Sequence, residues 1–154
     1  MNDTGKVDTL NDWFLGNVDA QDLFTRIVFI AHAWDDLVDK DKPVPEGDVN
    51  LLMLNSMLHI PMNPFFRKYE AELRAVIFCS MISYMAANQM ERSKNEHKVE
   101  IAHYLRYAVT QVVVFMLGAI HGVDNAPAIV AEAMVYMMPE RLSDYAAEHL
   151  GSGA

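Results

Sequence analysis

Apolar residues recur three or four positions apart along most of the chain, which is the spacing of one face of an α-helix. The first long run of this kind stops at the sequence KPVPEG and consists of Leu23, Ile27, Ile30, Trp34 and Leu37. It predicts a helix from about 20 to about 41, with Asp19 and Asp22 as a capping pair at its start. A short helix ending near Gly16 is expected before it.

The pattern continues with two helices separated by prolines. Asp48 can cap a helix through VNLLMLNSMLH, which Pro61 is expected to close because proline has no N–H to donate. Asn63 and Pro64 then form an N-cap and a first helical position, and the helix they begin runs to about Ser93. Its middle, AVIFCSMISYMAA, is apolar on nearly every side. This predicts a central helix surrounded by others, with a buried and inert Cys79.

The remaining sequence adds helices and no other regular structure. After the polar hinge ERSKNEHK a helix is expected from about 96 to Ile120, and Asn125 with Pro127 begins a last helical region that restarts after Pro139. No strand alternation and no repeat is present. We therefore expect an all-α helical bundle with three long helices and several shorter ones, roughly 80–90% helical. One domain should cover residues 1–150, followed by a flexible tail over 151–154.

Composition narrows the classes of partner. Twelve basic and twenty-one acidic residues give a formal net charge of −9, which opposes binding to nucleic acid and to anionic lipid. The longest apolar run, Val112 to Ile120, is shorter than the ~20 residues of a membrane span, and the start of the chain has no apolar leader. A single cysteine cannot form an internal disulfide. We therefore expect a cytoplasmic protein that binds neither nucleic acid nor membrane.

An acidic cluster ends the first long helix. His32, Asp35, Asp36 and Asp39 are offset by three, four and seven residues, so helix geometry places them on one stripe. Their carboxylates repel one another and also oppose the negative end of the helix dipole. Oxygen ligands of this kind suit Mg²⁺ or Mn²⁺. The stripe is either a solvated helix face or a metal site, and its continuation through apolar Val28 would suit an apolar channel with an acidic mouth.

The sequence FIAHAWDDLVDKD resembles the first aspartate-rich motif of the isoprenoid synthase superfamily, above all that of the squalene and phytoene synthases. The resemblance covers about a dozen residues. It implies an isoprenoid-synthase-like arrangement of helices in which Asp35, Asp36 and Asp39 bind Mg²⁺. In that family the metal ions hold a prenyl diphosphate whose hydrocarbon tail lies in an apolar channel. Catalytic members are close to twice as long as this chain, so the resemblance leaves open whether this protein is an enzyme.

The superfamily also requires a second acidic set on a facing helix. The expected set here is Glu96, Glu100 and His103. An alternative is Asn88 with Glu91, which lacks the hydroxyl residue of the family pattern at Arg92. Three basic residues of the hinge are expected to meet the diphosphate: Arg92, Lys94 and Lys98.

Two other functions stay open. A non-catalytic interaction or regulatory protein would offer the acidic stripe to a partner with a basic surface, or would form a homodimer. An amphipathic segment suits either the core or a dimer interface, and we expect it in the core: Leu51, Leu52, Leu54, Met57 and Leu58. Glu100 and His103 also form Glu-x-x-His, the ligand pair of di-metal carboxylate bundles. That interpretation lacks a second such pair.

Overall fold

The computed structural model describes residues 4–40 and 42–151, and side chains from residue 9 onward. The structure is 81% helical, and the described residues contain no strand. The all-α prediction is therefore confirmed. The helices form two compact units, residues 1–70 and 71–154. The prediction of one domain over residues 1–150 stays a prediction. Asp41, at the predicted end of the first long helix, and most of the predicted tail lie outside the described residues.

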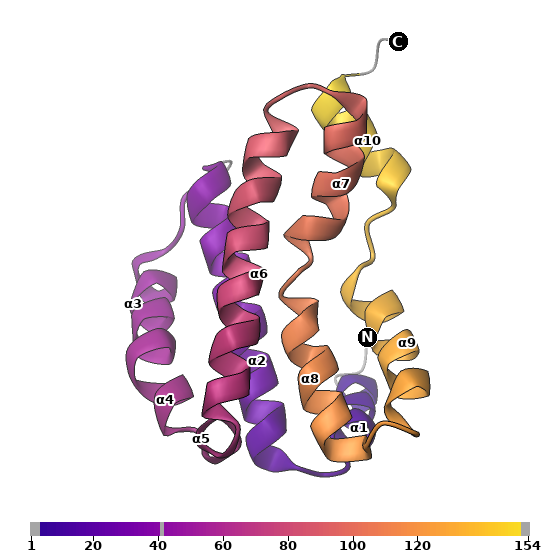
Figure 1. Cartoon of the computed structure of the whole chain (residues 1–154). Coiled ribbons are helices and arrows are strands. Elements are labelled where there is room, and N and C mark those ends of the chain that lie inside the picture. The colour runs from indigo at the N-terminus through magenta and orange to yellow at the C-terminus, as the bar shows by residue number, and fades with distance from the viewer. Residues whose placement is uncertain (1–3, 41, 152–154) are drawn as a thin grey trace. The chain divides into compact units, whose positions relative to one another are not determined.

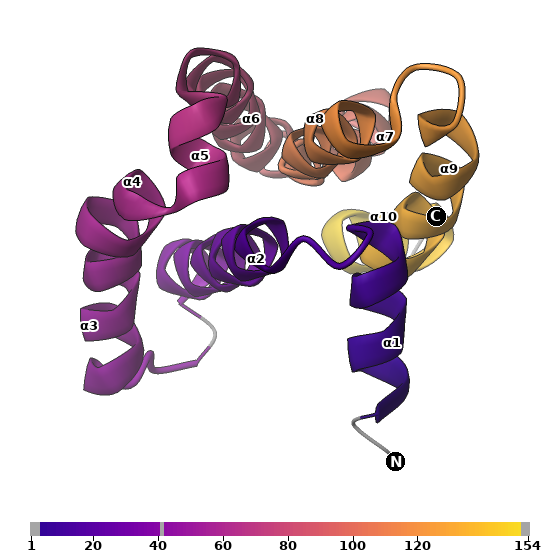
Figure 2. The ribbon, with the colours of Figure 1, turned by 90° about the horizontal axis from the view of Figure 1, so that it is seen from below.

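The first unit is built around one long helix. Its elements are α1 (Thr4–Trp13), α2 (Val18–Asp39), α3 (Glu46–Leu54), a π-helical turn η1 (Asn55–His59), α4 (Ile60–Met62) and α5 (Pro64–Lys68). α3, η1 and α5 pack against α2 (Figures 1 and 2). The Phe24 ring of α2 lies 6.5 Å from the ring of Trp13 and 5.5 Å from that of Phe14, and all three side chains are buried. Aromatic burial therefore ties α2 to the end of α1.

Both ends of α2 are capped. The Asn17 side chain accepts a hydrogen bond from the Ala20 N–H, so the N-cap lies two residues before the predicted Asp19. At the other end Lys40 adopts a left-handed conformation (φ 59°), and its N–H donates to the Asp36 carbonyl. The helix ends at Asp39, close to the predicted limit of about 41.

The helix that was expected to close at Pro61 continues to Met62. A proline inside a helix lacks the N–H, and its ring crowds the carbonyl four residues earlier, here that of Met57. Met57 belongs to η1, the π-helical turn, in which the bonds span five residues. There the Ile60 N–H donates to the Asn55 carbonyl. The wider turn thus keeps the proline within helical structure, and the predicted stop at Pro61 is wrong.

The second unit contains the other long helix. Its elements are α6 (Glu70–Glu91), which begins at the boundary between the units, α7 (Glu96–Arg106), α8 (Thr110–His121), α9 (Ala126–Met137) and α10 (Leu142–Leu150). α8 packs with α9, and α7 packs with α10 (Figure 1). A buried cluster of Ala87, Val99, Ala102 and Tyr145 joins α6, α7 and α10.

Two of the three predicted long helices are broken. The helix expected from 64 to 93 is interrupted at Tyr69 (φ −121°, ψ 32°), and the helix expected from 96 to 120 is interrupted over residues 107–109. At the second break the Ser80 hydroxyl donates to the Ala108 carbonyl at 2.8 Å, and the Thr110 hydroxyl donates to the Tyr107 carbonyl at 2.7 Å. These hydroxyls satisfy carbonyls at the break and so stabilise it.

Candidate functional sites

The predicted acidic stripe lies in the last turns of α2. His32 and Asp39 are exposed, whereas Asp35 and Asp36 are half-buried. The Asp36 Oδ1 lies 3.0 Å from the Nζ of Lys42, which follows the helix. This lysine puts a cation beside the negative end of the helix and offsets part of the repulsion, although an ion pair open to solvent contributes little stability. Both side chains line a hollow of about 330 Å³.

The predicted second acidic set is not brought together. Glu96 and Glu100 are exposed on α7, and the Glu100 Oε2 lies 3.7 Å from the Nδ1 of His97. His103 is buried instead, with its Nε2 3.0 Å from the Glu140 carbonyl. A carbonyl only accepts, so Nε2 donates. Glu100 and His103 therefore engage different partners, which separates the Glu-x-x-His pair as well.

The basic residues of the predicted diphosphate site are exposed around the turn between α6 and α7: Arg92, Lys94 and Lys98. Within the described residues, no three His, Cys, Asp or Glu side chains form a group that could hold a metal ion. No assembled Mg²⁺ or Mn²⁺ centre is therefore present among these residues. The predicted ligand set draws its acids from both units, and the convergence of its two halves stays a prediction.

A polar network that the sequence did not reveal joins α2 to the π-helical turn. The Arg26 Nε donates to both carboxylate oxygens of Asp22, at 2.9 and 3.0 Å. The Arg26 Nη1 donates to the Asn55 Oδ1 at 2.6 Å and lies 2.8 Å from the His59 Nδ1, which accepts because a guanidinium group only donates. The Asn63 Nδ2 donates to Asp22 at 3.1 Å, while the Asn63 Oδ1 caps α5.

This Arg26 network is structural. Asn55 and Asn63 are buried, so their hydrogen bonds replace lost contacts with water. The hydrogen bond from Arg26 holds the pKa of Asp22 below its ordinary value. The spacing of Asp22 and Arg26 is visible in the sequence as an i,i+4 pair. The contacts of Arg26 with Asn55 and His59 are not visible in the sequence, because the π-helical turn sets the direction of these two side chains.

A second polar cluster surrounds Tyr145 in α10. The Tyr145 hydroxyl donates to the Glu91 Oε1, and the Arg106 guanidinium lies 5.2 Å from the Tyr145 ring. Rings of His103 and His149 lie 5.1 and 4.4 Å from the Tyr145 ring. Burial, reinforced by Glu91, raises the pKa of Tyr145, so the phenol keeps its proton and acts as a donor. The cluster fixes α10 against α6 and α7.

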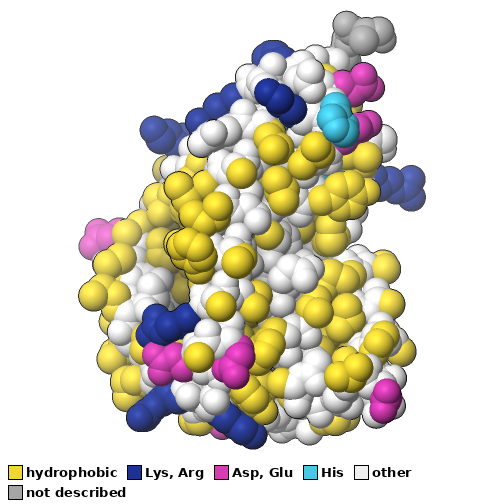
Figure 3. Space-filling view, in the orientation of Figure 1, with side chains coloured by type: hydrophobic (Ala, Val, Ile, Leu, Met, Phe, Trp, Pro, Cys, Tyr) yellow, Lys and Arg dark blue, Asp and Glu magenta, His cyan; other side chains and the backbone are white. Residues whose placement is uncertain are grey.

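α6 exposes an apolar face. Phe78 is 65% exposed, and Met81, Ile82 and Met85 are also exposed, at the i, i+3, i+4 and i+7 positions of one helix stripe. Figure 3 shows apolar side chains gathered over the middle of α6. The sequence predicted a helix surrounded on every side with a buried Cys79. Both expectations are wrong, because Cys79 is exposed as well.

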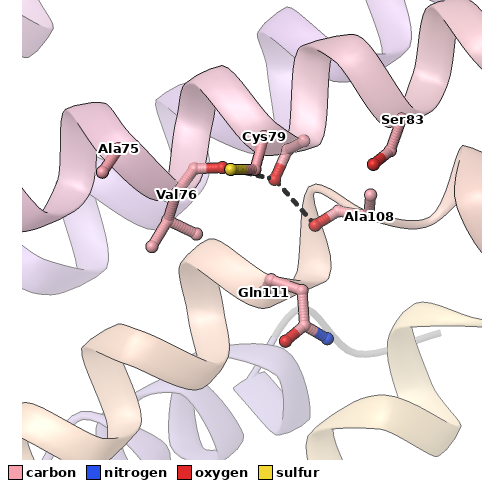
Figure 4. A pocket seen from close by; sticks show the side chains of 7 residues that line it. Ala75, Val76, Cys79, Ser83, Ala108 and Gln111 are labelled. Carbon is pink, nitrogen blue, oxygen red and sulfur yellow. Dashed lines mark hydrogen bonds between the residues drawn. The ribbon is translucent and has the colours of Figure 1, made fainter.

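A hollow of about 340 Å³ lies beside this face, between α6 and the start of α8 (Figure 4). It is lined by Ala75, Val76, Cys79, Ser80, Ser83, Ala108 and Gln111. The Ser80 hydroxyl is engaged by the Ala108 carbonyl at its edge (Figure 4). None of the seven residues is charged or histidine, so the hollow offers no base to activate a nucleophile.

α3 is apolar without being buried. Five of its nine residues are apolar, yet none of the nine is buried. Leu51 is 37% exposed and Leu54 48%, and Met57 in the following turn is 73% exposed. The expectation that these residues belong to the core is wrong, and their alternative as an interface gains support.

Comparisons with known proteins supply no relative. No known protein family, no curated protein and no solved structure matches this chain. The resemblance to isoprenoid synthases therefore depends on the motif alone and stays a prediction. Within the described residues no single helix is long and apolar enough to cross a membrane, and one bent pair, α7 with α8, meets that criterion jointly by length and composition, with a 42° bend.

Proposed function

We propose that this protein acts by binding other protein chains through exposed apolar helix faces rather than by catalysis. The observation that carries the proposal is α3, where five apolar residues lie on a nine-residue helix without one buried side chain. Exposed apolar residues are ordinary when scattered, but contiguous ones indicate a binding surface. The hollow beside α6, which has no charged or histidine lining, points away from acid–base chemistry.

The surface of α3 continues through the turns that follow it. The exposed residues of this surface, termed the α3–α4 face, are Leu51, Met53, Leu54, Met57, Leu58 and Met62. Three of the six are methionines, whose flexible and polarisable side chains adapt to a partner of variable shape. The face therefore suits an amphipathic helix that lays its apolar side on it.

The charge of the first unit indicates which residues should lie beside the apolar stripe of that partner helix. The first unit has six basic and twelve acidic residues, a net charge of −6, which is two thirds of the charge of the whole chain. Glu46 and Asp48 stand at the start of α3 itself. An amphipathic helix with basic residues beside its apolar stripe is attracted to this unit, and one with acidic residues is repelled.

The experiment is a titration of the full chain with a synthetic amphipathic helix that has leucine on one face and lysine on the other. We expect a micromolar dissociation constant that weakens about tenfold in Leu54→Glu, a change of about 1.4 kcal/mol. The matched control is Val135→Glu on α9, which is 79% exposed and outside the face. Replacing lysine by glutamate in the peptide should abolish binding. Equal affinity for both peptides, or no effect of Leu54→Glu, would overturn the proposal.

A second proposal is the Mg²⁺-dependent diphosphate site implied by the motif. Its support is that α2 ends with Asp35, Asp36 and Asp39 within its last turns, as the motif requires. Titration with Mg²⁺ should raise the melting temperature of the wild-type protein, and Asp35→Asn with Asp39→Asn should abolish the rise. An unchanged melting curve at millimolar Mg²⁺ excludes this function. It leaves the interaction proposal intact.

A further inference from the structure

The exposed stripe of α6 is self-complementary. Its four large side chains are Phe78, Met81, Ile82 and Met85, here termed the α6 face. Phe78 and Met85 are equally distant from the midpoint between Met81 and Ile82. A two-fold axis at that midpoint, perpendicular to two antiparallel copies of α6, places each Phe78 against the Met85 of the other copy. A methionine sulfur beside an aromatic ring is a favourable contact.

Charges at the two ends of α6 select the antiparallel arrangement. Glu70 and Glu72 are exposed in its first turn, whereas Arg92 and Lys94 are exposed just after its last residue. Antiparallel copies bring the acidic start of each helix beside the basic end of the other. Parallel copies would set acid against acid and base against base.

The helix positions bring Glu70 and Arg92 to the same flank of such a pair. An α-helix advances about 100° per residue, which puts both residues on the side of Met81 when viewed along α6. With the axis between Met81 and Ile82, residue 70 of one copy lies opposite residue 93 of the other, one helical rise (about 1.5 Å) from Arg92. Arg74 lies opposite Gln89 in this register, so no pair of like charges meets across the α6 face.

We propose that the chain forms an antiparallel homodimer through the α6 face. This inference depends on the proposed function, since it assigns a second copy of the chain as the occupant of one apolar helix face. The α3–α4 face is left for the basic partner.

The area of the α6 face predicts a weak dimer. Each of the four side chains is about half exposed, and with about 200 Å² for a large side chain they remove about 400 Å² per copy from water. The two copies together bury about 800 Å² of these side chains, below the ~1,200–2,000 Å² of a stable interface. We therefore expect dissociation in the micromolar range, with monomer and dimer in exchange.

Sedimentation equilibrium of the full chain tests this association. The wild-type protein should pass from 17.4 kDa to twice that mass as its concentration rises through the micromolar range. Phe78→Glu should raise the dissociation constant at least about tenfold, because each dimer would bury two carboxylates. Val135→Glu, at an apolar residue of α9 that is 79% exposed, should leave it unchanged. A wild-type chain that stays monomeric at every concentration, or equal effects of the two variants, would overturn the dimer.

A charge exchange tests the orientation. Arg92→Glu should weaken the dimer about two- to fivefold by placing acid beside acid at both ends. Adding Glu70→Arg to the same chain should restore the affinity, because the pair is rebuilt with its signs exchanged. A double variant as weak as Arg92→Glu alone would contradict the antiparallel pairing.

Disulfide trapping locates the two-fold axis. In a Cys79→Ser background, Met81→Cys lies near the axis and should form a disulfide-linked dimer under mild oxidation. Met85→Cys lies four residues further along and should not, because its counterpart is at the other side of the axis. A parallel pair would cross-link at both positions. Cross-linking at Met85→Cys alone, or at both, would refute the arrangement.

The two proposals fail in different ways. Leu54→Glu should weaken binding of the basic peptide and leave the dimer unchanged, whereas Phe78→Glu should weaken the dimer and leave peptide binding unchanged. If Phe78→Glu weakens the peptide in a chain that never dimerises, the α6 face binds a partner protein, which overturns the dimer and retains the proposed function. If neither the peptide nor a second copy binds, both proposals fall.

Discussion

Arg26→Met removes the centre of the network between α2 and the π-helical turn and keeps most of the methylene stem. The variant leaves the Asp22 carboxylate, the Asn55 Oδ1 and the His59 Nδ1 without the guanidinium group that bonds to all three. The three lost contacts differ in value. The total loss of folding free energy follows from the exposure of each group and from the other hydrogen bonds that the group can still form.

Asp22 contributes least, since its side chain is 45% exposed and can return to water. Asn55 contributes most, because it is only 2% exposed and a charge-assisted bond to a buried group is worth about 1.5–3 kcal/mol. Part of this is recovered, because the His59 Nδ1 lies 3.0 Å from the Asn55 Oδ1 and can donate to it after a change of tautomer. We expect a net loss of about 2 kcal/mol and a fall in melting temperature of about 4–8 °C.

Urea unfolding followed by tryptophan fluorescence measures this loss in the unit concerned, because both tryptophans, Trp13 and Trp34, belong to residues 1–70. The matched control is Arg67→Met on α5, where the arginine is exposed. It should change stability by no more than about 0.5 kcal/mol. If Arg26→Met costs no more than Arg67→Met, the network contributes nothing measurable and the reasoning from burial is wrong.

Three further outcomes follow from the two polar clusters. Arg26 holds the pKa of Asp22 below its ordinary value of 3.8, so this carboxylate stabilises the fold fully above pH 3.8 and ceases to do so as the pH falls through the lower folded-state pKa. Asp22→Asn should therefore reduce the loss of stability that the wild-type protein shows at acidic pH. Asn63→Ala removes the cap of α5 and the bond to Asp22, and should cost about 1–2 kcal/mol in urea unfolding. Tyr145→Phe should lower the circular-dichroism melting temperature by removing the donor to Glu91, whereas Tyr104→Phe, 62% exposed, should not.

Local signals in the sequence were sufficient for most helices. Asn63 followed by Pro64 predicts the start of α5, and the Asn63 side chain indeed accepts from the Phe66 N–H. The break over residues 107–109 was beyond local reasoning. Its carbonyl at Ala108 is bonded by Ser80, which lies 28 residues earlier in the chain. A contact of that separation leaves no trace in the spacing of apolar residues.

The candidate sites show the same division between local and distant causes. The spacing of three aspartates predicted their common place at the end of α2. The partner of the buried His103 could not be identified locally, because the carbonyl that engages it, Glu140, lies 37 residues further on. The prediction that α6 is buried on every side was wrong for another reason. Apolar composition predicts burial but does not say whether the same chain or another supplies the cover. Only the structure shows that Phe78 is exposed, and hence that its own chain does not cover it.

The π-helical turn makes the length of one short segment as important as its composition. A π-turn holds one residue more than an α-turn, so winding the same residues 55–59 at α-helical pitch would rotate everything after them by about 100°. Asn63 would then face away from Asp22 while every amino acid of the Arg26 network was still present in the chain. Homologues that conserve this network should therefore tolerate substitutions at Ser56, and one that lacks a residue of this turn should keep the direction of Asn63 only by forming an α-turn there.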